Sequence, residues 1–313
     1  MHDFSSAVPP ASPSAPASPS SLNGTTAAGY RSVFRPGLFA GQTVWVTGGG
    51  SGIGRCTAHE LAALGARVVI SGRRLERLEQ VATEIREDGG EAHPVAFDIR
   101  DEAAVQAGVA RVLTELGPVS GLVNNAGGQF PAPMLAISKK GFDAVVANNL
   151  TGGFLMMREL FNQCMQRHGG AIVNMTADFR NGMPGMAHSG AARAGMSNLT
   201  QSAAFEWAHA GVRVNAVAPG WIASSGMDTY GGALKMLIPK LREHVPLRRL
   251  GVEAEVSAAI VFLLSPAAAF ITGVTLQIDG AASLGSGIFP LPAHARSLPF
   301  DGFHRAVVPE VLR

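Results

Sequence analysis

The sequence predicts a single α/β domain built on a doubly wound parallel sheet with helices on both faces. Three observations predict this fold. Short, uniformly apolar runs recur between residues 41 and 280, as the buried strands of a parallel sheet require. Segments with apolar residues at helical spacing separate these runs. A glycine-rich turn follows the first run, where such sheets bind nucleotides.

Seven apolar runs are expected to form the strands. They cover residues 43–48, 67–72, 93–98, 120–127, 171–176, 212–220 and 273–280. Few of these runs alternate with polar residues, so both faces of the sheet are expected to be covered. The clearest helical patterns cover residues 56–65, 75–88 and 255–264. Strands and helices therefore alternate along the chain, which is typical of parallel sheets with crossover helices.

The two ends of the chain differ from the middle in composition. Residues 1–30 are mostly Pro, Ala and Ser, with little to bury, and are predicted to form a disordered tail. The tail has neither the apolar core of a secretory signal nor the arginines of a transit peptide, which favours a cytoplasmic protein. Residues 31–284 are expected to form one domain, and residues 285–313 a loop-like C-terminal extension.

The overall composition excludes several classes of function. A formal net charge of +2 gives no attraction for nucleic acid or for an anionic membrane. The two cysteines, Cys56 and Cys164, stand far apart and suit neither a disulfide framework nor a metal site. No apolar run reaches the length of a membrane span, so no membrane insertion is expected.

The glycine-rich turn indicates a dinucleotide cofactor. Glycines let the chain turn sharply and bring backbone N–H groups close to a pyrophosphate, and the following helix N-terminus adds partial positive charge. A turn of this kind between a first strand and a first helix is typical of Rossmann-like folds. The residues expected to hold the cofactor here are Gly48, Ser51, Gly52, Ile53 and Gly54.

The end of the second strand indicates which dinucleotide binds. An NAD-dependent enzyme usually places an acidic residue there for the ribose 2′-hydroxyl, and this chain has none beside Ser71. Arg73 and Arg74 follow instead, and guanidinium groups suit a 2′-phosphate. NADP(H) is therefore the expected cofactor, with Asp98 and Ile99 placed beside its adenine at the end of the third strand.

Three ordered motifs give the chain a family resemblance. T-G-x-x-x-G-I-G spans residues 47–54, N-N-A-G spans residues 124–127, and N-L-T-G spans residues 149–152. In this order they resemble the short-chain dehydrogenase/reductase family over about residues 41–284. The resemblance implies an oxidoreductase that assembles as a homotetramer.

The same resemblance implies roles for further residues. It implies that Asn149 belongs to a catalytic proton network. It also implies that the N-N-A-G segment lines the cofactor, through Asn125, Ala126 and Gly127. The segment 219–222 is implied to close over the nicotinamide carboxamide, through Pro219, Gly220 and Ile222.

The catalytic positions depart from the family's usual pattern. Members that reduce ketones carry Tyr-x-x-x-Lys on the helix after the fifth strand, and Ser189 and Arg193 stand at those two positions here. A serine hydroxyl is a poor acid but hydrogen-bonds an oxyanion well. An arginine stays protonated, so it can clamp the cofactor ribose and supply charge but cannot relay a proton.

This donor set favours reduction of a conjugated C=C bond. Hydride addition at the β-carbon leaves negative charge on a thioester oxygen, which Ser189 and Arg193 could stabilise. The segment 188–222 resembles the trans-2-enoyl-CoA reductases within the family. The next most similar group, the 2,4-dienoyl-CoA reductases, keeps the lysine and adds a tyrosine in the loop that is 176–187 here, where this chain has none. The expected function is NADPH-dependent reduction of trans-2-enoyl-CoA, an acyl-CoA-type substrate.

The sequence leaves the proton donor open. Tyr230 lies in an expected substrate lid and is one hypothesis, with a packing role as the alternative. His188 is another, because histidine titrates near neutrality, although a residue at a helix start more often caps or packs. Thr176 and Trp221 are also expected to contact substrate.

Other functions stay open at this stage. The chain could act on a dienoyl-CoA, on an acyclic terpenoid or on a carbonyl substrate with the same fold. Because both usual proton-handling residues are replaced, it could also be a non-catalytic NADP(H)-binding protein. The cofactor motifs do not separate these functions, since a sensor would keep them.

Overall fold

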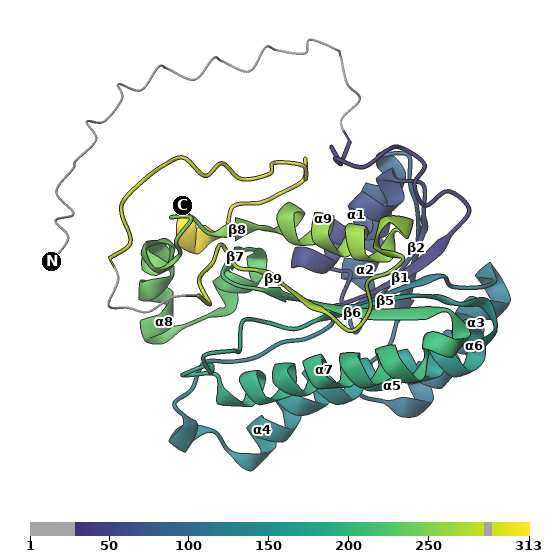
Figure 1. The fold of residues 1–313 in the computed structure, drawn as a ribbon, viewed down its shortest axis with the longest axis horizontal. Helices are drawn as coiled ribbons and strands as arrows, with labels where there is room; N and C mark the ends of the chain where they lie inside the picture. The colour runs from purple at the N-terminus through teal and green to yellow at the C-terminus, as the bar shows by residue number, and fades with distance from the viewer. Residues whose placement is uncertain (1–28, 285–289) are drawn as a thin grey trace, which may run out of the picture.

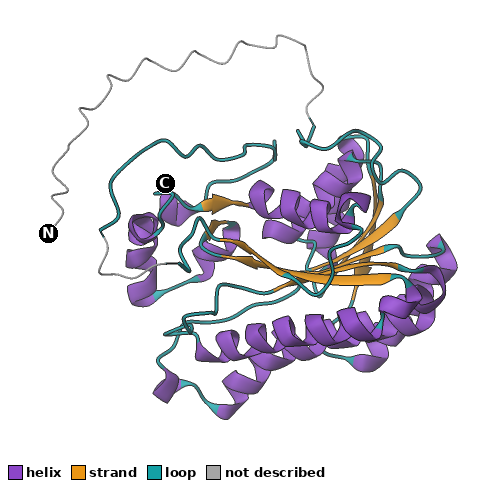
Figure 2. Cartoon of the chain, viewed as in Figure 1, coloured by secondary structure: helices purple, strands orange, loops and turns teal. Residues whose placement is uncertain are grey.

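A computed structural model describes residues 29–284 and 290–313, and its centre is a seven-stranded parallel sheet (Figures 1 and 2). The strands are β1 Thr43–Thr47, β2 Arg67–Gly72, β3 Glu91–Ala96, β4 Gly121–Asn124, β5 Gly170–Met175, β6 Val212–Pro219 and β9 Thr275–Ile278. Their order, β3-β2-β1-β4-β5-β6-β9, runs outward in both directions from β1. The predicted doubly wound, Rossmann-like fold is confirmed.

Helices cover both faces of the sheet. In Figure 1, α1, α2 and α9 lie on one face, and α3, α5 and α7 lie on the other. The helices are α1 Gly52–Ala63, α2 Leu75–Glu87, α3 Glu102–Leu116, α4 Lys139–Val146, α5 Gly152–Leu160, α6 Gln166–His168, α7 Ala187–Glu206, α8 Gly232–Leu237 and α9 Glu253–Leu264. None of the helices in the described part of the chain is long and apolar enough to cross a membrane.

Each central strand contributes to two apolar cores. Val44 and Val46 of β1 pack beneath α1 and α9, whereas Trp45 between them packs against the α3 and α5 side. The Trp45 indole Nε1 is buried and donates to Ser71 Oγ at 3.0 Å, so its polar atom is satisfied. The two-sided burial explains why the strands read as continuous apolar runs.

The lid region follows β6 and has structure that the sequence did not predict. Strand β7 (Ile222–Ala223) pairs in parallel with strand β8 (Gly251–Val252), and the two form a small second sheet. Between them lie the 3-10 helix η5 Ser225–Thr229, then α8, and the 3-10 helix η6 Ile238–His244. We call residues 222–250 the lid.

The N-terminal lead-in is part of the folded body from its first described residues. Residues 1–28 of the expected tail lie outside the described residues. The expected tail extended to Tyr30, and this boundary is wrong: the Tyr30 hydroxyl donates to Glu60 Oε2 at 3.1 Å and its ring packs against Phe303. A tyrosine can bury its ring while its hydroxyl finds a hydrogen-bond partner, so Tyr30 packs on the domain although the Pro, Ala and Ser before it offer little to bury.

The C-terminal extension, residues 290–313, runs back across the domain as a loop that ends in the 3-10 helix η8 Glu310–Leu312 (Figure 1). Arg305 forms ion pairs with Asp88 at 2.8 Å and with Glu87 at 3.0 Å at the end of α2. The Val311 N–H donates to Asp228 Oδ1 of η5 at 3.1 Å. The extension therefore contacts both the end of α2 and the lid.

Candidate active site

The turn between β1 and α1 leaves room only for backbone. A Cβ added at Gly48, where φ is +66°, would lie 2.9 Å from Asn125 Nδ2, and one added at Gly54 would lie 2.4 Å from the Gly48 carbonyl oxygen. Asn125 Nδ2 donates to the Thr47 carbonyl at 3.0 Å, and the Ala126 N–H donates to Thr47 Oγ1 at 2.9 Å. The predicted glycine turn and the N-N-A-G segment thus brace one another.

The N-terminus of α1 fits the pyrophosphate of a dinucleotide. Gly52 begins the helix with φ +57°, Ile53 follows it, and Ser51 at the N-cap makes no side-chain capping bond. The first turn carries no acidic residue, so its free N–H groups meet no negative charge of their own helix. Glu253 is the nearest carboxyl, at 3.8 Å from the Cβ position of Gly52, and burial raises the pKa of Glu253 to about 7.

The adenosine end carries the two predicted arginines. Arg73 and Arg74 are exposed after β2. Asp98 forms a 2.5 Å ion pair with Arg100, whose hydrogen bonds, together with the charges of Arg100 and Arg73, lower the pKa of that carboxyl. Ile99 is buried and packs against the start of α5. The guanidinium groups of Arg73 and Arg74 face solvent with no acid on β2, which suits a 2′-phosphate.

Asn149 holds the loop at Gly128 in place through its side-chain amide. It lies in the π-helical turn η2 Ala147–Thr151 and is buried. Its Nδ2 donates to the Gly128 carbonyl at 2.7 Å and to the Val145 carbonyl at 2.8 Å, and its Oδ1 accepts from the Gly128 N–H at 3.0 Å. Both of its side-chain N–H groups are occupied, and the proton-network role that the family resemblance implied stays a prediction.

Arg193 brings a buried positive charge into the site. Its Nη1 donates to the Met175 carbonyl at 2.6 Å, and its Nη2 lies 2.7 Å from the position of a Cβ at Gly127. Burial lowers the pKa of Arg193 to about 10, with the Tyr230 phenol acting in the opposite direction, so the guanidinium stays protonated near neutrality. Its Nε has no partner within the described chain, and a buried donor of this kind suits a hydroxyl of the cofactor ribose.

Three side chains from separate elements form a hydrogen-bonded chain at the start of α7. Ser189 Oγ is buried and donates to Gln129 Oε1 at 2.9 Å. Gln129 Nε2 in turn donates to the Tyr230 hydroxyl oxygen at 3.1 Å. The predicted residues Ser189 and Tyr230 therefore lie in one site, joined by a residue that sequence reasoning did not single out.

This arrangement favours Tyr230 over Ser189 as the donor to a substrate, and the oxyanion role of Ser189 stays a prediction. A serine hydroxyl has a single proton, and Gln129 already receives it, so Ser189 has no proton left for an oxyanion. The Tyr230 oxygen receives an N–H and keeps its own proton free. Gln129 could have been suspected from its place two residues after the N-N-A-G segment, which ends in the cofactor site.

His188 is held by its neighbour at the start of α7. Its Nδ1 accepts from the Ser189 backbone N–H at 2.9 Å, so the proton of the neutral ring lies on Nε2. The ring is fully buried and packs edge-to-face with Phe130 at 4.5 Å between centroids. These contacts support the packing alternative for His188 over the acid role.

Thr176 does not offer a free donor to a substrate, contrary to expectation. The residue is buried, and its hydroxyl donates to the Val217 carbonyl of β6 at 2.8 Å. β5 ends one residue earlier, so Thr176 still takes part in the sheet's hydrogen bonding. Its hydroxyl therefore stabilises the end of the sheet.

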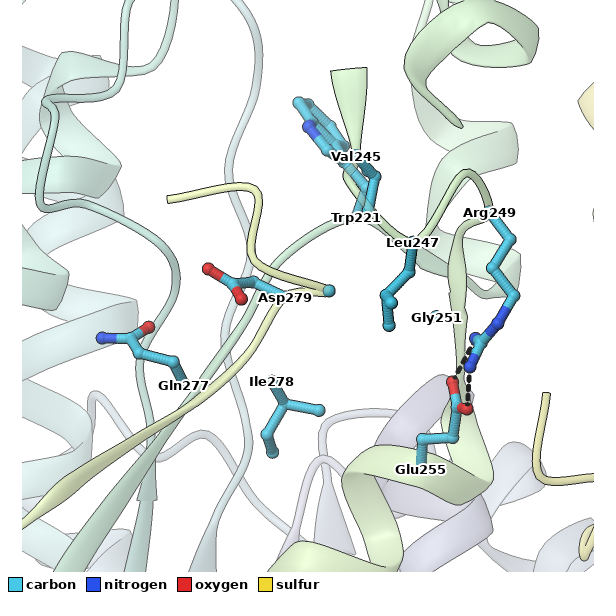
Figure 3. Close-up of a pocket in the computed structure, with 10 residues that line it drawn as sticks. Trp221, Val245, Leu247, Arg249, Gly251, Glu255, Gln277, Ile278 and Asp279 are labelled. Carbon is cyan, nitrogen blue, oxygen red and sulfur yellow. Dashed lines mark hydrogen bonds and ion pairs between the residues drawn. The ribbon is translucent and has the colours of Figure 1, made fainter. Parts of the chain in front are cut away.

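The segment after β6 leads from the cofactor site to a cavity of about 220 Å³. Pro219 ends β6, the Gly220 N–H donates to the Ile278 carbonyl at 3.0 Å, and Ile222 is buried in β7. Figure 3 shows the cavity with the Arg249–Glu255 ion pair on one side and Asp279 on the other. Its lining residues are Trp221, Val245, Leu247, Arg249, Gly251, Glu255, Gln277, Ile278, Asp279 and Gly280.

This cavity does not coincide with the hydroxyl cluster. Trp221 lines it, but Ser189, Gln129 and Tyr230 do not. The hydroxyls and the buried guanidinium belong to the cluster and not to the lining of the cavity. We therefore locate the candidate active site at Ser189, Gln129, Arg193 and Tyr230.

Comparison with known proteins identifies the family of the chain. A family model described as enoyl-(acyl carrier protein) reductase matches residues 48–283. The peroxisomal 2,4-dienoyl-CoA reductase of Pongo abelii is 36% identical over 258 residues, which cover 82% of this chain and 88% of that protein. The enzyme of the same name from Danio rerio is 35% identical over 260 residues, covering 82% and 86%.

Solved structures show the same relationship. A protein titled citronellol catabolism dehydrogenase (AtuB) from Pseudomonas aeruginosa PAO1 is 63% identical, with a TM-score of 0.74 over 82% of this chain and 100% of that one. A short-chain type dehydrogenase/reductase from Mycobacterium marinum is 28% identical, with a TM-score of 0.74 over 78% and 96%. With its fold and ordered motifs, the chain belongs to the short-chain dehydrogenase/reductase family.

Proposed function

We propose that this chain catalyses the NADPH-dependent reduction of the 2,3 double bond of trans-2-enoyl-CoA thioesters. One observation carries the proposal: the Tyr230 hydroxyl of the lid is joined to Ser189 of α7 through Gln129, and Tyr230 interacts electrostatically with the buried charge of Arg193. An acid of this kind outside the Tyr-x-x-x-Lys position suits protonation of carbon. The similarity to enoyl and dienoyl thioester reductases supports the substrate class.

The residues present can supply everything except the hydride. NADPH, when bound, supplies that hydride to the β-carbon of the substrate. The electron pair of the double bond moves toward the α-carbon and the thioester oxygen, and the positive charge of Arg193 stabilises it. The Tyr230 O–H then protonates the α-carbon, and the resulting phenolate accepts the Gln129 N–H and interacts electrostatically with Arg193. A positioned acid contributes about 10²- to 10⁴-fold in rate.

The choice of NADPH rests on the adenosine end of the site. Two exposed arginines, Arg73 and Arg74, follow a strand that offers no carboxylate to a ribose 2′-hydroxyl. Arg193 would clamp the nicotinamide ribose through its unpartnered Nε. Gly48 and the first turn of α1 would receive the pyrophosphate.

The test combines a substrate panel with a pair of tyrosine variants. Purified protein with NADPH is expected to reduce a medium-chain trans-2-enoyl-CoA faster than a 2,4-dienoyl-CoA, a 3-oxoacyl-CoA or a simple ketone. Tyr230→Phe is expected to lower kcat about 10²-fold. Tyr30→Phe is the matched control, because it removes the one other tyrosine hydroxyl, which hydrogen-bonds Glu60 away from the site.

Three outcomes would count against the proposal. Turnover of the ketone without turnover of the enoyl thioester would favour a carbonyl reductase. Faster turnover of the dienoyl thioester would reassign the chain to dienoyl-CoA reduction. NADPH binding without any turnover would favour a non-catalytic binding protein.

A second candidate function is oxidation or reduction of an acyclic terpenoid. It is favoured by the 63% identity to a protein whose title names citronellol catabolism. Oxidation of such an alcohol needs a base at its hydroxyl, and Tyr230 beside Arg193 is the group available. NADP⁺-dependent oxidation of citronellol at a rate above that of enoyl-CoA reduction would favour this candidate.

The assembly and the location of the protein also remain proposals. The homotetramer implied by the family would have four times the 32.4 kDa mass of the chain, which light scattering measures directly. We retain the cytoplasm as the proposed compartment, and fractionation of the source cells tests it against the peroxisomal location in the names of several relatives.

A further inference from the structure

We infer that Gln129 is a positioning residue that decides which of two active-site hydroxyls presents its proton to the substrate. The inference rests on the proposed function for the identity of the reacting molecule. The hydrogen-bond arrangement itself involves only Ser189, Gln129 and Tyr230 and can be tested without substrate.

The orientation of the cluster follows from the chemistry of a primary amide. The amide oxygen can only accept hydrogen bonds, and the amide nitrogen can only donate them. A glutamine placed between two hydroxyls must therefore take the proton of one and give an N–H to the other. Here Ser189 faces the oxygen at 2.9 Å and Tyr230 faces the nitrogen at 3.1 Å, so the free proton belongs to Tyr230. The reverse orientation of the amide would free the Ser189 proton and occupy that of Tyr230.

The charges around the cluster favour this orientation. The Arg193 guanidinium is buried and interacts electrostatically with the Tyr230 phenol. The amide N–H also points its positive end at the same oxygen. This N–H stays on the Tyr230 oxygen as a donor to an oxyanion formed there. Ser189 is fully buried at the start of α7, where its own N–H is already taken by His188.

The backbone near Gln129 is held in place, so the Gln129 amide keeps the orientation that leaves the Tyr230 proton free. Gln129 follows Gly128, whose N–H and carbonyl are both bound by the Asn149 side chain at 3.0 Å and 2.7 Å. The Gln129 side chain is half-buried between α7 and the lid residue Tyr230. Asn149 thus fixes the backbone on which Gln129 stands, so the buried Asn149 amide acts on the reaction by positioning Gln129.

Two substitutions separate proton selection from a structural role. Gln129→Glu keeps the shape, but its carboxylate can only accept, so it takes the protons of both hydroxyls. Gln129→Leu takes neither proton and leaves that of Tyr230 available. At about pH 8 we expect kcat to fall about 10²-fold in Gln129→Glu and about tenfold in Gln129→Leu, with KM changed by less than about threefold. A residue that only packs would show the opposite order, because Leu is the less conservative change.

The pH profile adds a second readout. When the carboxyl group introduced by Gln129→Glu is protonated, it has one donor and one acceptor, as the amide has. Gln129→Glu is therefore expected to recover activity as the pH falls, while Gln129→Leu is not. Three titratable or charged groups are connected to this cluster: Tyr230 bonds Gln129, His188 bonds the Ser189 N–H, and Arg193 interacts electrostatically with Tyr230. All three are kept in both variants. Greater activity of Gln129→Glu than of Gln129→Leu at about pH 8 would overturn the inference.

A spectroscopic measurement makes the test independent of turnover. In ¹⁵N-glutamine-labelled protein, Gln129→Leu identifies the Gln129 side-chain amide signal. Tyr230→Phe removes the acceptor of that N–H, so the signal is expected to move upfield and its protons to exchange faster. An unchanged signal would overturn the inference. If the wild-type protein fails to reduce any enoyl thioester, the proposed function fails, whereas this measurement still decides the role of Gln129.

Discussion

Arg73 and Arg74 provide the sharpest test of cofactor choice. Each guanidinium is exposed after β2, and Asp98, whose carboxyl interacts electrostatically with Arg73, is already paired with Arg100 at 2.5 Å. Replacing Arg73 with Ala therefore removes a donor to a 2′-phosphate without releasing a buried charge. A hydrogen bond between two charged groups contributes about 1.5–3 kcal/mol, and solvent exposure favours the lower end.

The lower end corresponds to about a tenfold loss for each arginine, because about 1.4 kcal/mol is a factor of ten in an equilibrium constant. The double variant Arg73→Ala/Arg74→Ala is expected to lower kcat/KM for NADPH about 10²-fold and to leave kcat/KM for NADH nearly unchanged. The loss for NADPH should shrink at high salt, since exposed charges are screened.

The assay measures kcat/KM for both cofactors at two salt concentrations. Arg111→Ala is the matched control, because it removes an exposed arginine from α3 whose partner is Glu115 in the same helix. An unchanged ratio of NADPH to NADH efficiency in the double variant would refute the assignment of a 2′-phosphate site. An equal loss with both cofactors would refute it as well, since it would indicate damage to the shared part of the site.

Three other changes give distinct outcomes. Gly54→Ala would bring a Cβ within 2.4 Å of the Gly48 carbonyl oxygen, so NADPH binding should weaken more than about tenfold in a fluorescence titration, and wild-type affinity would contradict the packing. The pKa of Glu253 is raised to about 7 from 4.5, so its stabilising contribution is complete below pH 4.5 and is lost as the pH rises through 7. Relative to wild type, Glu253→Gln should gain about 3 kcal/mol of unfolding free energy from about pH 4 to about pH 8 in urea, and parallel pH curves would argue against a buried carboxyl. Arg305→Ala loses the ion pairs with Asp88 and Glu87, so Tm should fall by about 2–6 °C and a protease should cut the extension first; an unchanged Tm would show that the extension is held by other contacts.

The regular part of the fold could be predicted because its signals are local. The runs at β1 and β2 are apolar on both faces, and the observed strands agree with the expected ones within a few residues. The glycine turn was also readable, because Gly48 and Gly54 must lack a Cβ for the β1–α1 turn to pack on Asn125. In both cases the residue type is enough for the prediction: apolar side chains indicate a strand buried on both faces, and glycine indicates a position without room for a Cβ.

The arrangement of the site depends on contacts that no local pattern encodes. Gln129, Ser189 and Tyr230 come from three segments that meet only in the folded chain. The sequence does not show whether a hydroxyl side chain faces a site or bonds the backbone. Thr176 was therefore predicted to contact substrate, although its hydroxyl donates to the Val217 carbonyl. The C-terminal extension lacks periodicity, which left its contacts with the lid unpredictable.

The contact between the two ends of the chain sets when the fold can be completed during synthesis. Cys56 shares one apolar cluster with Tyr30, from the start of the domain, and with Phe303, from the extension. Phe303 leaves the ribosome only after the whole sheet has emerged, so until then the Cys56 thiol lacks part of its cover. Once the cluster is closed, the thiol is fully buried and burial raises its pKa, which makes it unreactive. Faster thiol labelling of Cys56 in a chain truncated before Phe303 than in the full chain would therefore show the cover that the extension adds.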